Sequence, residues 1–184
     1  MEATTGRSPR ALKARMRAIS DRIRGAQALQ IRREPIPWAY RVFFRHIGLD
    51  PDTNRTPIEE LIFRRIYEGG LYSNGRVEDA LAVATLEVGV ALQAFDADRI
   101  DGEVGLRRSL EGEKFEGRTA PLPSGTIVIA DGQRPVGILF SRTAEGREPG
   151  KRTTRMLLIA IGVSGVPELA LEEGLWVAAS GLRA

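Results

Sequence analysis

Apolar residues in the first half of the chain recur three or four positions apart, the spacing that places side chains on one face of a helix. A serine and a proline, Ser8 and Pro9, stand just before the first such stripe and suit an N-cap and a first helical position. We therefore expect an amphipathic helix to follow residues 1–8, which themselves are typical of a disordered start. The stripe consists of Leu12, Met16, Ile19 and Ile23.

Three further helices are predicted before residue 90. Pro35 and Pro37 are expected to break the first helix, and residues 38–47 then form a short aromatic-rich helix that Gly48 ends. Thr56-Pro57-Ile58-Glu59 is a capping box with proline at the first helical position. It predicts a helix that stops at Gly69-Gly70, and a fourth helix is expected over residues 76–88.

The apolar spacing then changes from about 3.6 to 2, which indicates strands. We expect strands at residues 104–109, 126–130, 136–140 and 156–161, followed by a final amphipathic helix that opens at Pro167. Helices first and strands second favour an α+β fold over a wound βαβ unit. The expected architecture is a group of N-terminal helices packed on a mixed or antiparallel β core, with a C-terminal helix. We divide the chain into a basic N-terminal helix with its flexible start, residues 1–35, and a single domain, residues 36–184.

Composition is that of a globular protein of ordinary size. The chain has 184 residues, of which 42% are hydrophobic and 28% charged, enough for one domain. The longest apolar stretch, residues 156–166, is about half the length that a membrane-spanning helix needs. No leader-peptide pattern is recognisable at the start. These observations predict a cytoplasmic protein without a membrane partner.

The chain lacks the side chains that several catalytic mechanisms require. The chain has no cysteine and a single histidine, His46, so thiolate ligands, a cysteine nucleophile and a multi-histidine metal site are not expected. No phosphate loop or dinucleotide-binding glycine pattern is recognisable. We therefore expect neither a metal nor a cofactor.

Basic residues gather at the front of the chain. Residues 1–34 hold nine Arg or Lys against three acids. This cluster indicates either attraction to RNA phosphates or a solvated helix face. A similar choice applies to Trp38, Phe43 and Phe44, which either stack on bases or pack in the core.

The stretch from Thr56 to Gly162 carries a series of ordered blocks. They are Thr56-Pro57, Arg64-Arg65, Leu86-Glu87-Val88-Gly89, Ala94-Phe95-Asp96-Ala97-Asp98-Arg99-Ile100 with Gly102, Arg107, Gly112-Glu113, Ile127 to Asp131, and Thr153 with Met156-Leu157-Leu158. In order and spacing they resemble the B3/B4 domain, the editing domain of the phenylalanyl-tRNA synthetase beta subunit. Residues 38–51 are similar to the leader of free-standing B3/B4 proteins.

The resemblance implies a central cleft that receives the acceptor end of a charged tRNA, where water attacks the aminoacyl ester. The family's histidine position is occupied by Gln93, its asparagine position by Ala82, and its glutamate position by Glu145. Leu139 and Phe140 stand where the family has two glycines. We expect Glu145 and Gln93 to be the catalytic residues.

The same resemblance predicts a substrate pocket and an RNA surface. The pocket residues are Ala82, Phe95, Asp96, Leu139, Phe140 and Thr153, and the tRNA-binding residues are Arg15, Arg22, Arg24, Arg99 and Arg107. Three functions fit these residues. They are a deacylase that acts in trans on mischarged tRNA, a non-catalytic RNA-binding or adaptor domain, and a protein that binds an amino-acid-like small molecule in a biosynthetic context.

Overall fold

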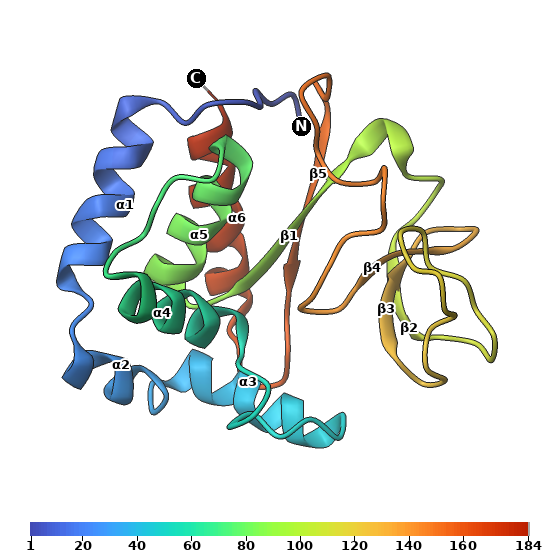
Figure 1. The fold of residues 1–184 in the computed structure, drawn as a ribbon, viewed down its shortest axis with the longest axis horizontal. Coiled ribbons are helices and arrows are strands. Elements are labelled where there is room, and N and C mark those ends of the chain that lie inside the picture. Colours follow the sequence, from blue (N-terminus) through green and yellow to red (C-terminus); the bar gives the residue numbers. More distant parts are fainter. Residues whose placement is uncertain (184) are drawn as a thin grey trace.

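Helices and two small antiparallel sheets form the two sides of the molecule (Figure 1). The structure, a computed structural model, describes residues 1–183. The elements are α1 (Arg10–Arg22), α2 (Gly25–Ile31), α3 (Pro35–His46), α4 (Pro57–Glu68), α5 (Arg76–Val88), β1 (Ala91–Asp96), the short 3-10 helix η1 (Ala97–Arg99), β2 (Gly105–Arg108), β3 (Ile127–Ala130), β4 (Pro135–Ile138), β5 (Met156–Ile161) and α6 (Glu168–Leu182).

The helical side is built around α5, which packs on both α1 and α6 (Figure 1). The stripe predicted for α1 is buried: Leu12, Met16, Ile19 and Ile23 are all less than a tenth exposed. Their neighbours in this core include Val83 of α5 and Leu182 of α6. The helical periodicity therefore identified the face that holds α1 against the domain.

Each of the two sheets is antiparallel. β1 pairs with β5, with Ala91 opposite Ile161 and Asp96 opposite Met156. The second sheet has the order β2-β3-β4 and lies away from the helices (Figure 1). The predicted α+β class, with an antiparallel β core and a C-terminal helix, is confirmed.

The first helix does not run up to Pro35, because α1 ends at Arg22. The aromatic-rich helix, expected from residue 38, begins at Pro35. A proline in the first turn of a helix gives up an N–H that has no partner there, and its fixed φ suits the helix. The strand β1 was not predicted either. Its six residues carry no simple alternation, and their burial is mixed.

The start of the chain, for which we expected flexibility, lies along β5 and α6 (Figure 1). The amino group of Met1 donates to the carbonyl oxygen of Met156 at 2.8 Å, and the Ala3 N–H donates to the Thr154 carbonyl at 2.9 Å. Ser8 donates from its hydroxyl to the buried carboxylate of Asp79 at 2.5 Å. The bonds of Met1 and Ala3 place the first residues along β5, and the Ser8 bond ties the chain to α5.

None of the helices among residues 1–183 combines the length and the apolar character needed to span a membrane.

Candidate functional site

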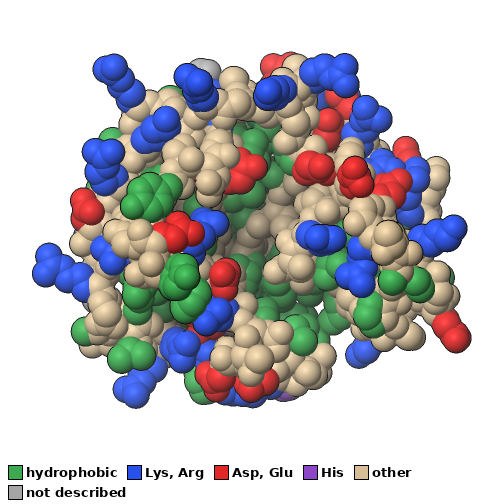
Figure 2. Space-filling view, in the orientation of Figure 1, with side chains coloured by type: hydrophobic (Ala, Val, Ile, Leu, Met, Phe, Trp, Pro, Cys, Tyr) green, Lys and Arg blue, Asp and Glu red, His purple; other side chains and the backbone are tan. Residues whose placement is uncertain are grey.

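A cavity of about 830 Å³ separates the helical side from the β2-β3-β4 sheet. Figure 2 shows the hollow near the middle of the face that Figure 1 presents. α4 and α5 form one wall, and the start of β3 together with the turn after β4 forms the other. β1 passes between them, so the cavity has residues of helix, strand and turn within reach of one another.

Gln93 brings a polar group to this cavity from the middle of β1. Its Oε1 atom is buried and accepts no hydrogen bond from any described residue. A Cβ on Gly137 would lie 3.6 Å from Gln93 Nε2 and 3.2 Å from the Phe95 ring, so the glycine leaves room for both side chains. An unsatisfied buried acceptor costs about 1–3 kcal/mol, and a ligand N–H or O–H would satisfy it.

The apolar part of the cavity comes from Ala82 of α5 and from Leu139 and Phe140, which follow β4. Phe140 has a φ of 57° and is the one non-glycine residue with positive φ in the described chain. Its ring packs on three aromatic rings of α3, and is stacked on Phe44 at a centroid distance of 5.2 Å. The left-handed conformation costs an L-residue other than glycine about 1–2 kcal/mol, and these ring contacts offset that cost for Phe140.

Two arginines, Arg55 and Arg64, line the cavity together with Glu60 and Glu78. Arg55 lies 3.5 Å from Glu60. Arg64 makes no hydrogen bond or ion pair with any described residue. The cavity therefore offers a cationic side chain that a phosphate or carboxylate group could engage without breaking a bond inside the protein.

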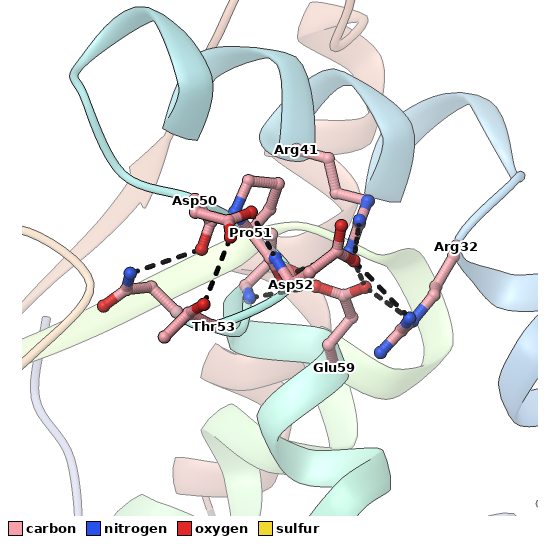
Figure 3. A network of polar contacts seen from close by, with 9 residues as sticks. Arg32, Arg41, Asp50, Pro51, Asp52, Thr53 and Glu59 are labelled. Carbon is pink, nitrogen blue, oxygen red and sulfur yellow. Dashed lines mark hydrogen bonds and ion pairs between the residues drawn. The ribbon is translucent and has the colours of Figure 1, made fainter.

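A polar network with a buried centre fixes the segment that leads from α3 to α4 and supplies Asn54 and Arg55 to the cavity (Figure 3). At its centre Arg41, which is 5% exposed, donates to Glu59 at 2.6 Å and also to Asp52. Arg32 lies 3.1 Å from the same Glu59 carboxylate. The Arg41 guanidinium lowers the pKa of Asp52. Glu59 also accepts from the Thr56 N–H at 3.1 Å, as the predicted capping box requires.

Of the six residues predicted for the pocket, Ala82, Leu139 and Phe140 line the cavity and three lie elsewhere. Phe95 is fully buried beneath it, against Gly137. Asp96 ends β1, and its carboxylate accepts from the Thr153 hydroxyl at 2.7 Å and from the Asp98 N–H at 3.1 Å. The bond from Thr153 ties the end of β1 to the segment before β5. Asp96 and Thr153 therefore have a structural role at these positions.

The structure does not bring Glu145 and Gln93 together. Glu145 is exposed and packs beside Gly117, in the loop that follows β2. Its N–H donates to the Glu116 carbonyl at 3.2 Å. Family spacing placed this residue in the cleft, but the segment after β4 carries it to the loop that holds Glu116 and Gly117, and it does not line the cavity.

None of the five arginines predicted to bind tRNA lines the cavity. Arg15 donates to Glu87 of α5 at 2.8 Å, and Arg107 holds Glu113 through two bonds of 2.9 and 2.6 Å. Arg22 donates to the Ala18 carbonyl, while Arg24 and Arg99 are exposed. Sequence reasoning missed Arg55 as a site residue. Arg64 belongs to the Arg64-Arg65 pair that resembles the family, and its position on α4 away from the buried Ile58 and Ile62 could have identified it.

Together, these elements define an α+β domain whose central cavity combines an apolar wall, a buried amide and cationic residues. The chain belongs to the B3/4 domain family, whose model matches residues 39–167.

Curated relatives are beta subunits of phenylalanine–tRNA ligase. The subunit from Streptomyces avermitilis is 36% identical over 94 residues, which are 50% of this chain and 11% of that protein. The subunit from Gloeobacter violaceus is 32% identical over 108 residues, 56% of this chain and 14% of the relative. The subunit from Protochlamydia amoebophila is 31% identical over 116 residues, which are 61% of this chain and 14% of that protein. The chain therefore matches only a small part of the length of these relatives.

Proposed function

We propose that this domain binds the acceptor end of tRNA and hydrolyses the ester of a mischarged aminoacyl-tRNA in trans. The observation that carries the proposal is the buried, unpaired Oε1 of Gln93 in a cavity of about 830 Å³ that Arg55 and Arg64 also line. Family membership adds the link to tRNA, since the relatives are named as ligases that act on it.

The cavity residues fit the separate parts of such a substrate. Ala82, Leu139 and Phe140 provide an apolar wall for an amino-acid side chain. Arg64 is placed to attract a phosphate group. Gln93 accepts a hydrogen bond from the substrate's ammonium group or from the attacking water, and so orients one of them.

A glutamine does not take up a proton near neutral pH. The hydrolysis that we propose therefore depends on how the water and the ester are positioned, and not on a general base. Water adds to the ester carbonyl carbon, the bond from that carbon to the ribose oxygen breaks, and the ribose oxygen leaves with a proton. The neighbouring ribose hydroxyl and the substrate's own amino group are close enough to the ester to pass that proton. Hydrogen bonds that hold water and carbonyl in line supply the acceleration.

Gln93→Leu should slow hydrolysis of the accepted mischarged tRNA by about 10- to 100-fold, because it removes the buried, unpaired amide that we propose orients the reacting groups. The measurement is the first-order loss of radiolabelled amino acid from a panel of mischarged tRNAs, with and without protein. Gln30→Leu is the matched control, since Gln30 is an exposed residue of α2. If the wild-type protein accelerates the hydrolysis of no ester in the panel, the result would favour an RNA-binding domain without catalytic activity. If the protein does not bind tRNA even at low salt, the result would favour a protein that binds an amino-acid-like small molecule.

Glu145→Gln provides a second test of how the site is composed. We expect the rate of ester loss to change by less than twofold, because Glu145 lies at Gly117 and not among the residues that line the cavity. The same deacylation assay measures it. A loss as large as that of Gln93→Leu would mean that the segment after β4 rearranges around the bound substrate.

A further inference from the structure

A second hollow, of about 360 Å³, lies on the other side of α4, between that helix and α2. Leu29, Arg32, Arg55, Ile62, Phe63 and Ile66 are among its lining residues. Beside it Tyr67 is 81% and Phe63 41% exposed. Their rings are stacked, with centroids 6.0 Å apart and planes 15° from parallel. We call Phe63 and Tyr67 the aromatic ledge.

Arg55 connects the two hollows, because it lines both of them. Its guanidinium lies 3.6 Å from the centroid of the Phe63 ring and 3.5 Å from Glu60, which faces the cavity. α4 is thus a ridge with the cavity on one side and the aromatic ledge on the other. A chain that leaves the cavity past Arg55 meets the ledge next.

The side chains of the ledge match one kind of occupant. A pair of parallel, exposed rings presents flat apolar faces on which planar groups stack, and a guanidinium next to them favours an anion. Unpaired nucleotides combine a planar base with a phosphate at each step. Two further arginines lie close by, since Arg32 lines the second hollow and Arg64 lines the cavity. Arg64 makes no ion pair with a described residue, so a phosphate could engage it.

We propose that the aromatic ledge stacks an unpaired base of the RNA strand whose terminal residue occupies the cavity, with Arg55 on the phosphate between them. This proposal rests on the proposed function and adds the path of the strand across α4. It makes Phe63 and Tyr67 a binding surface for single-stranded RNA.

Tyr67→Ala should weaken binding of intact, uncharged tRNA at least about fivefold at constant salt, because it removes one stacking surface. Fluorescence anisotropy with labelled tRNA measures the Kd of the full-length protein. Tyr67→Phe keeps the ring and should keep the affinity within twofold. Trp176→Ala is the remote control, since Trp176 is 65% exposed but lies on α6. Tyr67 is too exposed for its loss to unfold the domain.

Salt dependence separates stacking from charge. Tyr67→Ala should lower the affinity at every salt concentration without changing the slope of log K against log salt, whereas Arg55→Gln should make that slope shallower by about one phosphate contact. Trimming the unpaired nucleotides from the acceptor end should remove the difference between wild type and Tyr67→Ala. Equal affinity of the two proteins for intact tRNA would overturn the proposal.

The outcomes distinguish this inference from the function on which it rests. Failure of the wild-type protein to bind tRNA at low salt rejects both. Binding that Tyr67→Ala leaves unchanged, with hydrolysis that Gln93→Leu slows, rejects the ledge alone. Binding that Tyr67→Ala weakens, without hydrolysis of any ester, supports the ledge and rejects the deacylase. Sedimentation in which Tyr67→Ala turns a dimer into a monomer would instead assign the ledge to a second copy of the chain.

Discussion

Arg41→Met is expected to lower the free energy of unfolding by about 3 kcal/mol. Removing one partner of a buried ion pair costs about 3–5 kcal/mol because the other charge stays buried without compensation. Here Glu59 is 4% exposed, but it keeps Arg32 and the Thr56 N–H as partners, so the lower end of that range applies. Urea denaturation at neutral pH measures the loss.

Arg32→Met is the matched control, because Arg32 contacts the same Glu59 carboxylate from a side chain that is 41% exposed. Exposed ion pairs contribute about 0–1 kcal/mol, so this variant should stay within 1 kcal/mol of wild type. Equal losses for the two variants would contradict our assignment of Arg41 as the centre of the network. Arg41→Met should also weaken tRNA binding, because the segment it holds carries Arg55 (Figure 3).

Tyr40→Phe is expected to cost about 2–4 kcal/mol at neutral pH. The buried hydroxyl of Tyr40 donates to the Ile161 carbonyl at 2.6 Å and accepts from the Ala91 N–H at 3.0 Å. Phenylalanine would leave two buried backbone groups of the β1–β5 pair unsatisfied, at about 1–3 kcal/mol each before relaxation. Tyr72→Phe is the control, since Tyr72 is 64% exposed.

The same hydroxyl should make the protein sensitive to alkali. Burial raises the pKa of Tyr40 to about 12, whereas an unfolded tyrosine has a pKa of about 10. The folded state therefore holds the phenolic proton more tightly. Stability is unaffected by this group below pH 10 and falls as pH rises to about 12, by roughly 2–3 kcal/mol in total.

Urea midpoints taken between pH 9 and 12 measure this fall, and the slope that Tyr40 contributes should be missing in Tyr40→Phe. A variant with the same alkaline slope as wild type would show that another group is responsible.

Helices that pack by one face were predictable, because their apolar residues repeat along a single stripe and their ends carry specific signals. The stripe of α1 and the capping box at Thr56 are both observed. β1 was missed because tertiary position decides its environment. Its residues meet helices on one side and the cavity on the other, so no alternation marks the strand. The start of α3 was misplaced at residue 38 because a proline, which disrupts a helix interior, also suits the first turn of a helix.

The candidate site was predictable only in part, for a related reason. Gln93 lies on β1 and Ala82 on α5, while Leu139 and Phe140 directly follow β4, and all four meet at the cavity. Glu145 lies in an irregular segment, where spacing along the chain says little about direction in space. Arg55 reaches the cavity through the segment that the Arg41 network holds, a contact between residues that no local pattern joins.

Phe140 uncouples the shape of the cavity from the path of the backbone. Its left-handed φ of 57° is one that glycine adopts at no cost. The turn after β4 would therefore keep its course with the smallest of side chains, while the ring that now fills the space between α3 and the cavity would be gone. Evolution can thus widen or narrow the room for a substrate at this position by exchanging one residue, without redesigning the turn that carries it.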